Sequence, residues 1–157
     1  MKATKWKSYS LALIAGMSVL TACSSDDNND NGGNGNNGNG NEIENGTTLK
    51  GTITSDVTLT AGSTYKLSGE YIVEEGATLN IEAGVKIISI YDDIVDYILV
   101  KQGGKINAVG TSSAPIVMTS EKEEPGAWGG IHICGKAHTN AEGGKGSSEI
   151  GGATYGG

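Results

Sequence analysis

The chain has 157 residues, with 26 Gly, no Phe, 36% hydrophobic residues and a net charge of −7. Its 11 basic residues are all Lys and face 18 Asp plus Glu, so the basic face and Arg forks typical of nucleic-acid binding are missing. The length suits one domain with a small core of Val, Ile and Leu, which disfavours a coiled coil or a large helical bundle.

The N-terminus has the pattern of an export signal. Lys2, Lys5 and Lys7 precede an apolar run at 11–20 that is too short to span a bilayer comfortably. The sequence LTAC at 20–23 resembles the lipobox of bacterial lipoproteins, in which the signal peptidase cuts before an acylated cysteine. We therefore expect residues 1–22 to be a lipoprotein signal peptide.

The resemblance implies cleavage between Ala22 and Cys23, with Cys23 as the site of lipid attachment. Two or three acyl chains hold a protein on a membrane almost permanently, because each buried methylene contributes about 0.8 kcal/mol. Cleavage leaves eight Lys against 18 acidic residues, a net charge of −10. Only Cys134 remains besides Cys23, so no intrachain disulfide is expected.

Residues 23–46 are dominated by Asn, Gly, Ser and Asp, and we expect them to form a disordered tether because they have almost no apolar surface to bury. The Ser-Asp-Asp step at 25–27 resembles the signal that sends Bacteroidetes lipoproteins to the outer face of the outer membrane. The alternative is that Asp26 and Asp27 belong to a solvated linker.

From Thr47 onward, short β-branched runs are separated by Gly. The runs TLNI at 78–81 and KINA at 105–108 alternate with period two, which predicts strands. The stretch 90–101 contains three Asp and many Ile, Val and Tyr residues, which favours a loop followed by a strand over a helix.

The strand pattern repeats along the chain. The segment YIVEEGATLNI at 71–81 returns 27 residues later as ILVKQGGKINA at 98–108. We predict a parallel β-helix with about 25 residues per turn, with Leu79, Ile106 and Ile131 in one inward ladder and Gly at the corners. A β-sandwich with Greek-key connections is the alternative, although it does not require a pattern to return at one period.

The segments EEGATLNIEAGVKI, VKQGGKINAVGTSSAPIVMTS and PGAWGGIHICGKA, within 71–137, resemble Bacteroidetes surface lipoproteins with a right-handed parallel β-helix. Met118 stands where Phe is usual in that family. The resemblance implies an all-β solenoid over residues 47–157. It also implies an incomplete one, because family members are several hundred residues long and GGATYGG at 151–157 offers no cap.

The densest acidic cluster contains Asp92, Asp93 and Asp96, flanked by Tyr91 and Tyr97. Carboxylates suit Ca²⁺ and aromatic rings suit a sugar face, so this loop is the candidate calcium or glycan site. The spacing is not that of an EF-hand, and a charged loop bulging from one coil is the alternative that we favour. Apart from calcium at this loop, the sequence suggests no cofactor and no metal site.

Two other features have plainer interpretations. Glu121, Glu123 and Glu124 precede Pro125 and are interpreted as a solvated turn. Trp128 precedes two glycines and is interpreted as a packing residue rather than a sugar-stacking platform.

His132, Cys134 and His138 do not have an established zinc spacing. His132 and Cys134 share one face of a predicted strand and could form a nucleophilic pair, but no third orienting group is evident. We expect His132 to face solvent.

Two functions fit these patterns. The favoured one is a non-catalytic rod on the outer membrane, anchored through Cys23, that binds neutral glycans or host and cell surfaces and does not bind nucleic acid. The alternative is a polysaccharide lyase or hydrolase whose active site lies wholly or partly in a missing C-terminal region. No catalytic residue is assigned, because a lyase needs a base and cations for its acidic polymer, and a hydrolase needs two positioned carboxylates.

Overall fold

The computed structural model describes residues 41–157. The predicted signal peptide, its cleavage site at Ala22 and Cys23, the lipid attachment and most of the tether lie outside the described residues.

Parallel strands in four successive coils make up most of this region. The first coil contains β1 (Asn41–Ile43) and β2 (Thr48–Ile53), and the second contains β3 (Val57–Leu59) and β4 (Thr64–Val73). The third contains β5 (Thr78–Ile81), β6 (Lys86–Ser89) and β7 (Tyr97–Val100), and the fourth contains β8 (Lys105–Ala108), β9 (Val117–Ser120) and β10 (Gly130–Ile133). A short 3₁₀ turn at Glu142–Gly144 then leads to the antiparallel pair β11 (Lys145–Ser147) and β12 (Thr154–Gly156).

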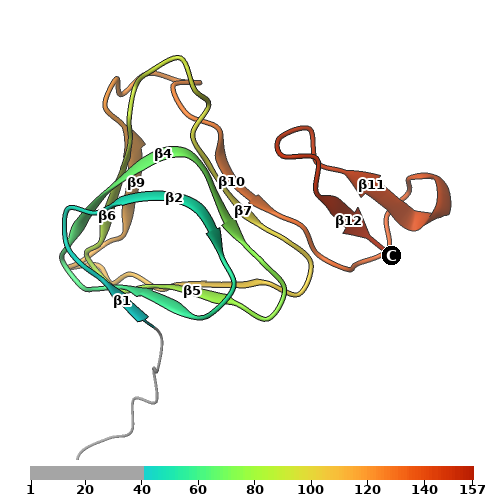
Figure 1. Ribbon diagram of the computed structural model, residues 1–157, viewed down its shortest axis with the longest axis horizontal. Coiled ribbons are helices and arrows are strands. Elements are labelled where there is room, and N and C mark those ends of the chain that lie inside the picture. Colours follow the sequence, from blue (N-terminus) through green and yellow to red (C-terminus); the bar gives the residue numbers. More distant parts are fainter. Residues whose placement is uncertain (1–40) are drawn as a thin grey trace, which may run out of the picture. The chain divides into compact units, whose positions relative to one another are not determined.

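The coils surround a core with three faces, as seen along the stack in Figure 1. One face is the sheet β1-β3-β5-β8, and the other two belong to the sheet β10-β7-β4-β6-β9, with β2 paired to β4. The long strand β4 turns a corner, because its first half pairs with β6 and its second half with β7. Gly69, with φ of +69°, lies between the two halves. The predicted parallel β-helix is confirmed.

The coils are not of equal length. The pairs β5–β8 and β4–β7 are offset by the predicted 27 residues, as in Leu79 with Ile106. The prediction of about 25 residues per turn is wrong elsewhere, because the offset is 22 in β3–β5, 31 in β6–β9 and 33 in β7–β10. The corner loops 90–96 and 121–129 account for most of the added length.

The longer last coil changes the partner of Ile131. Ile131 lies opposite Ile98 in β7, so its predicted place in the ladder of Leu79 and Ile106 is wrong. Ile131 and Ile133 are 40% and 65% exposed, since they point to the core side of the last coil, where no further strand covers them within the described residues.

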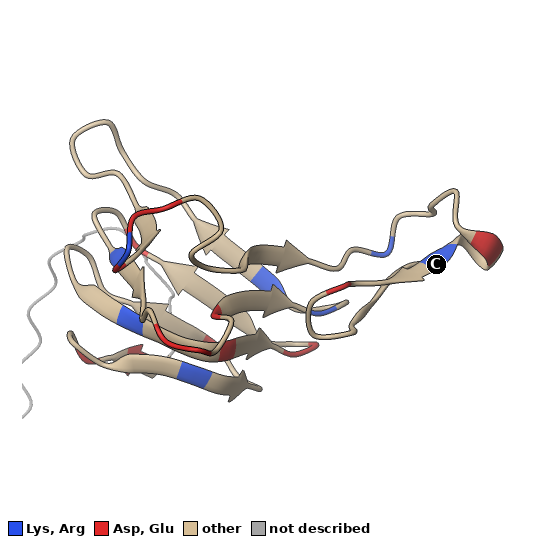
Figure 2. Ribbon diagram, turned by 90° about the horizontal axis from the view of Figure 1, so that it is seen from above, with Lys and Arg blue, Asp and Glu red and all other residues tan. Residues whose placement is uncertain are grey.

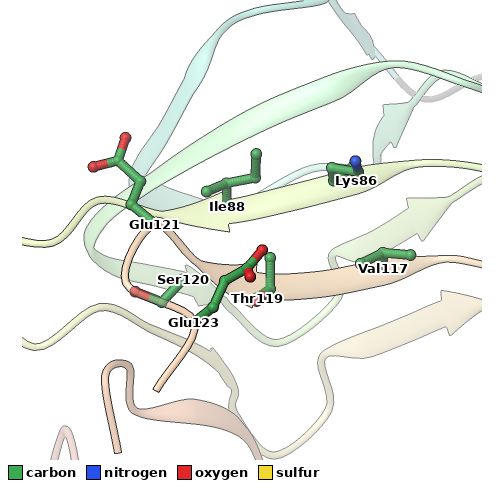
Figure 3. Close-up of a pocket in the computed structure, with 7 residues that line it drawn as sticks. All are labelled: Lys86, Ile88, Val117, Thr119, Ser120, Glu121 and Glu123. Atoms are coloured by element: carbon green, nitrogen blue, oxygen red, sulfur yellow. The ribbon is translucent and has the colours of Figure 1, made fainter. Parts of the chain in front are cut away.

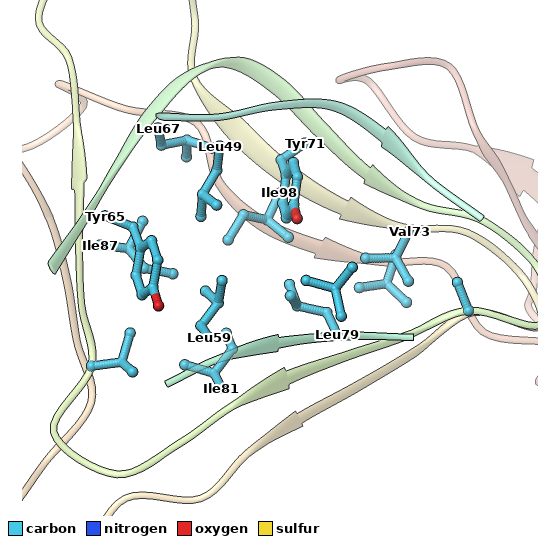
Figure 4. Close-up of a cluster of buried hydrophobic side chains, with 14 residues drawn as sticks. Leu49, Leu59, Tyr65, Leu67, Tyr71, Val73, Leu79, Ile81, Ile87 and Ile98 are labelled. Atoms are coloured by element: carbon cyan, nitrogen blue, oxygen red, sulfur yellow. The ribbon is translucent and has the colours of Figure 1, made fainter. Parts of the chain in front are cut away.

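Inward side chains from the coils form one buried cluster, shown in Figure 4. Fully burying such a side chain contributes about 1.5–3 kcal/mol. The members are Leu49, Val57, Leu59, Tyr65, Leu67, Tyr71, Val73, Ala77, Leu79, Ile81, Val85, Ile87, Ile98 and Val100. The hydroxyl of the buried Tyr65 donates to the Ile43 carbonyl at 2.9 Å, so its polar atom is satisfied.

Glycine marks the corners, as the sequence predicts. Gly76 has φ of +84° at the turn before β5, a conformation that L side chains disfavour. At Gly104, a Cβ would lie 2.7 Å from the Val73 carbonyl oxygen of the preceding coil.

The first strand begins at Asn41, inside the segment that the pattern assigns to the tether. Within residues 41–157, no helix is long and apolar enough to cross a membrane.

Candidate functional site

The acidic loop 90–96 is anchored by Asp96, which is only 1% exposed. One carboxylate oxygen, Oδ1, accepts a hydrogen bond from the Gly69 backbone N–H at 2.5 Å, and Oδ2 accepts from the Ser89 hydroxyl at 2.7 Å. Because Gly69 belongs to the preceding coil, Asp96 ties neighbouring coils together at the corner. Its role in this structure is therefore to hold the loop in place.

The other members of the predicted calcium or glycan site have separate surroundings. Asp92 accepts a hydrogen bond from the Ile94 backbone N–H at 2.8 Å, and Asp93 is exposed. The Tyr97 hydroxyl donates to Glu70 at 2.9 Å, and burial followed by this bond raises the pKa of Tyr97. Among residues 41–157, no three Asp, Glu, His or Cys side chains form a group that could hold a metal ion.

A groove of about 380 Å³ lies on the outer side of β6 and β9, shown in Figure 3. Outward side chains of the two strands form its floor, and the turn after β9 adds carboxylates at one end. The lining residues are Lys86, Ile88, Val117, Thr119, Ser120, Glu121 and Glu123. The groove therefore combines apolar surface with an ammonium, two carboxylates and hydroxyls.

One ion pair and one backbone hydrogen bond hold Glu121 at the acidic end of the groove. Glu121 Oε1 lies 3.2 Å from the Lys66 ammonium, and its other oxygen accepts from the Tyr91 backbone N–H at 3.4 Å. The bond from Lys66, followed by that from Tyr91, lowers the pKa of Glu121. Glu121 is consequently a carboxylate at neutral pH.

Tyr91, which belonged to the predicted site, lies beside this groove because its backbone contacts Glu121. Its ring is 55% exposed, with the Lys122 ammonium 4.6 Å from the ring centre. Lys122 also donates to the Tyr91 hydroxyl at 3.1 Å and pairs with Glu124 at 3.0 Å, and these contacts raise the pKa of Lys122. The turn predicted to be merely solvated is thus joined to the Tyr91 loop.

Glu123 has an unusual backbone conformation. Among residues 41–157 it is the one non-glycine residue with positive φ, at +46°. A left-handed conformation costs an L residue roughly 1–2 kcal/mol. The backbone N–H of Glu123 donates to the Ser120 carbonyl at 3.1 Å, closing the turn that brings its side chain to the groove.

Charges elsewhere in the described region are mixed rather than gathered into a basic face. Most acidic residues lie in turns and loops, whereas several lysines lie on strands (Figure 2). The strand lysines are Lys50, Lys66, Lys86, Lys105 and Lys145.

The remaining predicted residues have structural surroundings. Trp128 packs against the main buried cluster, which confirms its packing interpretation. His132 is half-buried, not solvent-facing as predicted, and its Nε2 lies 3.0 Å from the Gly129 carbonyl oxygen. Cys134 is 4% exposed, and burial raises the pKa of its thiol, so the thiolate that a nucleophile needs is disfavoured. His138 packs against Gly144.

Sequence reasoning missed the floor of the groove. Lys86, Ile88, Val117 and Thr119 point outward from β6 and β9, but the sequences KIIS and VMTS do not alternate between polar and apolar residues, so the pattern does not show which side chains face out. Their proximity depends on the 31-residue offset between β6 and β9, which no repeat in the sequence indicates.

The sequence of the coils matches that of a known protein family. Residues 51–157 match the family described as the pectate-lyase-like β-helix domain. Comparison with curated proteins and with solved structures gives no significant match. The matched region begins in β2 and covers the later coils and the β11–β12 pair, which is well over half of the chain. The chain therefore belongs to the family of pectate-lyase-like β-helix domains.

Proposed function

We propose that this protein is a non-catalytic, lipid-anchored β-helix of the bacterial outer surface that binds neutral glycans in the groove between β6 and β9. The observation that carries the proposal is the composition of that groove, in which Ile88 and Val117 adjoin hydroxyl and carboxylate groups. Sugars present C–H surfaces and hydroxyls together, so a site of this mixed kind suits them. Membership of a pectate-lyase-like family is consistent with glycan binding.

The charges favour a neutral ligand. Glu121 and Glu123 place two carboxylates at one end of the groove, and the lowered pKa of Glu121 keeps its charge at neutral pH. Carboxylates accept hydrogen bonds from sugar hydroxyls and repel uronic acids and sulfated sugars. The net charge of −7 for the whole chain adds to that repulsion.

Location at the cell surface rests on the N-terminal sequence. The signal pattern and Cys23 support lipid anchoring, and the Ser-Asp-Asp step supports an outward-facing position. Partners of this protein are then the membrane, through its lipid, and neutral glycans or surfaces that carry them.

Cleavage of a polysaccharide is the second candidate, because Lys86 and two glutamates line the same groove. An elimination needs a base, and a hydrolysis needs one protonated carboxyl beside one carboxylate. The Lys66 contact works against the acid role for Glu121, since it lowers the pKa. Incubation with acidic and neutral polymers, followed by assays for unsaturated products and new reducing ends, distinguishes this function from binding alone.

A glycan array with the purified protein tests the proposal. Val117 is 38% exposed in the groove, and Val109 is 72% exposed outside the residues that line it. We expect Val117→Arg to abolish binding to neutral glycans and Val109→Arg to leave it unchanged. A blank array, or equal effects of the two variants, would contradict the proposed site.

A further inference from the structure

The antiparallel pair β11–β12 covers the outer side of β7 and its neighbours, away from the core of the coils. A second, smaller buried cluster lies there, formed by Ile72 from β4, Tyr97 and Leu99 from β7, Cys134 and Ala153. Ile150 and Tyr155 pack against it from the same C-terminal segment. We call residues 145–156 the strap.

The covered surface is unusual for the outside of a coil. Leu99 is 1% exposed and Ile72 is 9% exposed, although both side chains point outward from their strands, opposite to the inward Ile98 and Val73. Apolar side chains on an outer sheet face require a cover to leave water. In this structure the occupant of the face is the chain's own strap.

The strap is attached by few polar contacts. The Gly156 N–H donates to the Gly135 carbonyl at 2.8 Å, and Gln102 Nε2 donates to the carbonyls of Gly135 and Gly156 at 3.0 and 2.7 Å. Ser148 Oγ lies 3.5 Å from His132 Nδ1. Strands β11 and β12 pair with each other and with no strand of the coils, and within the described residues no ion pair joins the strap to the coils.

One close backbone approach seats the strap. A Cβ at Gly151 would lie 2.9 Å from Leu99 Cδ2 and 3.1 Å from the Tyr97 hydroxyl oxygen, so an added methyl group would push against these buried side chains. The next residue, Gly152, has a similar positive φ, +63° against +71°, but a Cβ there would meet nothing within 4 Å. Substituting each glycine in turn therefore separates the effect of a close contact with the coils from the effect of positive φ in the turn.

We infer that the strap opens as a unit while the coils stay folded, and that opening uncovers the outer stripe of Ile72 and Leu99 together with the Cys134 thiol. Segments with few buried contacts open at lower free energy than the structure as a whole. The strap buries a handful of side chains, whereas the main cluster contains 14 buried members along the stack. Access to this face is thus gated by the chain itself.

The test uses Cys134 as a reporter in the full chain. Its thiol is labelled with a maleimide in native buffer, and the modified site is identified by peptide mass spectrometry so that Cys23 does not interfere. Hydrogen exchange of β11, β12 and β7 is followed in the same samples. For the native protein we expect Cys134 to label at a rate insensitive to low urea, and β11 and β12 to exchange well before β7.

The matched glycine variants give the decisive comparison. Gly151→Ala should speed labelling of Cys134 by about tenfold. Overpacking a closed contact typically costs enough free energy to raise the population of the open strap by this factor, which corresponds to about 1.4 kcal/mol. Gly152→Ala carries the same strain of positive φ but meets no neighbouring atom, so it should speed labelling clearly less than Gly151→Ala, and both variants should retain the thermal midpoint of the coils. Labelling that occurs only with global unfolding, equal effects of the two variants, or a loss of coil stability in Gly151→Ala would each overturn the inference.

Discussion

Asp96→Ala is the substitution that most sharply tests how neighbouring coils are joined. The carboxylate is 1% exposed and accepts two hydrogen bonds, from the Gly69 N–H and the Ser89 hydroxyl. Removing it leaves the buried Ser89 hydroxyl and the partly buried Gly69 N–H without this acceptor, and a buried donor without a partner costs about 1–3 kcal/mol. The release of a buried charge offsets part of that sum, so we expect the free energy of unfolding to fall by about 2–4 kcal/mol.

Asp96→Asn separates shape from charge. The amide oxygen can accept from Gly69, and the amide N–H can donate to the Ser89 oxygen, so both neighbours stay paired. We expect a loss of about 1 kcal/mol, less than for the alanine variant.

The assay is urea unfolding followed by circular dichroism, with Asp93→Ala as the control in the same loop. Asp93 is exposed, so its replacement should change stability by no more than about 0.5 kcal/mol. Equal free energies of unfolding for the Asp96→Ala and Asp93→Ala variants would refute the structural role of Asp96.

The structure makes three further predictions. Leu79→Ala, at a site with 0% exposure, should cost about 2–5 kcal/mol in urea unfolding, whereas Ile133→Ala, at 65% exposure, should cost little; comparable losses would refute the core assignment. Gly104→Ala, where a Cβ meets backbone at 2.7 Å, should destabilise more than Gly76→Ala, where the space is open and only φ is strained; the reverse order would refute the corner geometry. Burial raises the pKa of Tyr71 from 10.0 to about 12, so the stability it contributes is present below pH 10 and is lost as the pH rises toward 12. Tyr71→Phe should therefore flatten the fall in unfolding free energy between pH 10 and 12, and an unchanged slope would count against this burial.

The repeat with the clearest sequence signal is also the one that the structure reproduces. Leu79 and Ile106 occupy equivalent places in YIVEEGATLNI and ILVKQGGKINA, and they pair in adjacent coils with no residue inserted or deleted within either copy. Gly76 is predictable for a related reason, since a tight corner needs positive φ. The local sequence pattern is sufficient to predict which residues pair where two successive coils have the same length.

Insertions at one corner limit what the sequence predicts. The loops 90–96 and 121–129 lengthen the third and fourth coils. As a result, Ile131 is the partner of Ile98 in the neighbouring strand β7 and does not join the ladder of Leu79 and Ile106. An alternating pattern shows which residues of a strand share a side, but the partner strand depends on the length of each corner. The same uncertainty hides the groove, whose floor is made of β6 and β9.

The acidic loop shows why composition alone misjudges a site. Asp92, Asp93 and Asp96 are equally acidic in sequence, yet Asp96 is buried by the Gly69 and Ser89 contacts, which join residues 27 and seven positions apart. Tyr91 was singled out for its place beside the carboxylates, and it lies instead near Glu121 of the following coil. Contacts between coils, rather than neighbours in sequence, decide which of these residues are accessible.

The groove is tested most directly by NMR titration of the isotopically labelled protein with a neutral oligosaccharide selected on the array. The account predicts saturable shifts of the Ile88, Val117 and Thr119 signals, and their loss in Val117→Arg but not in Val109→Arg. Saturable shifts confined to another face, such as β5 and β8, or no shifts with any neutral glycan, would contradict it.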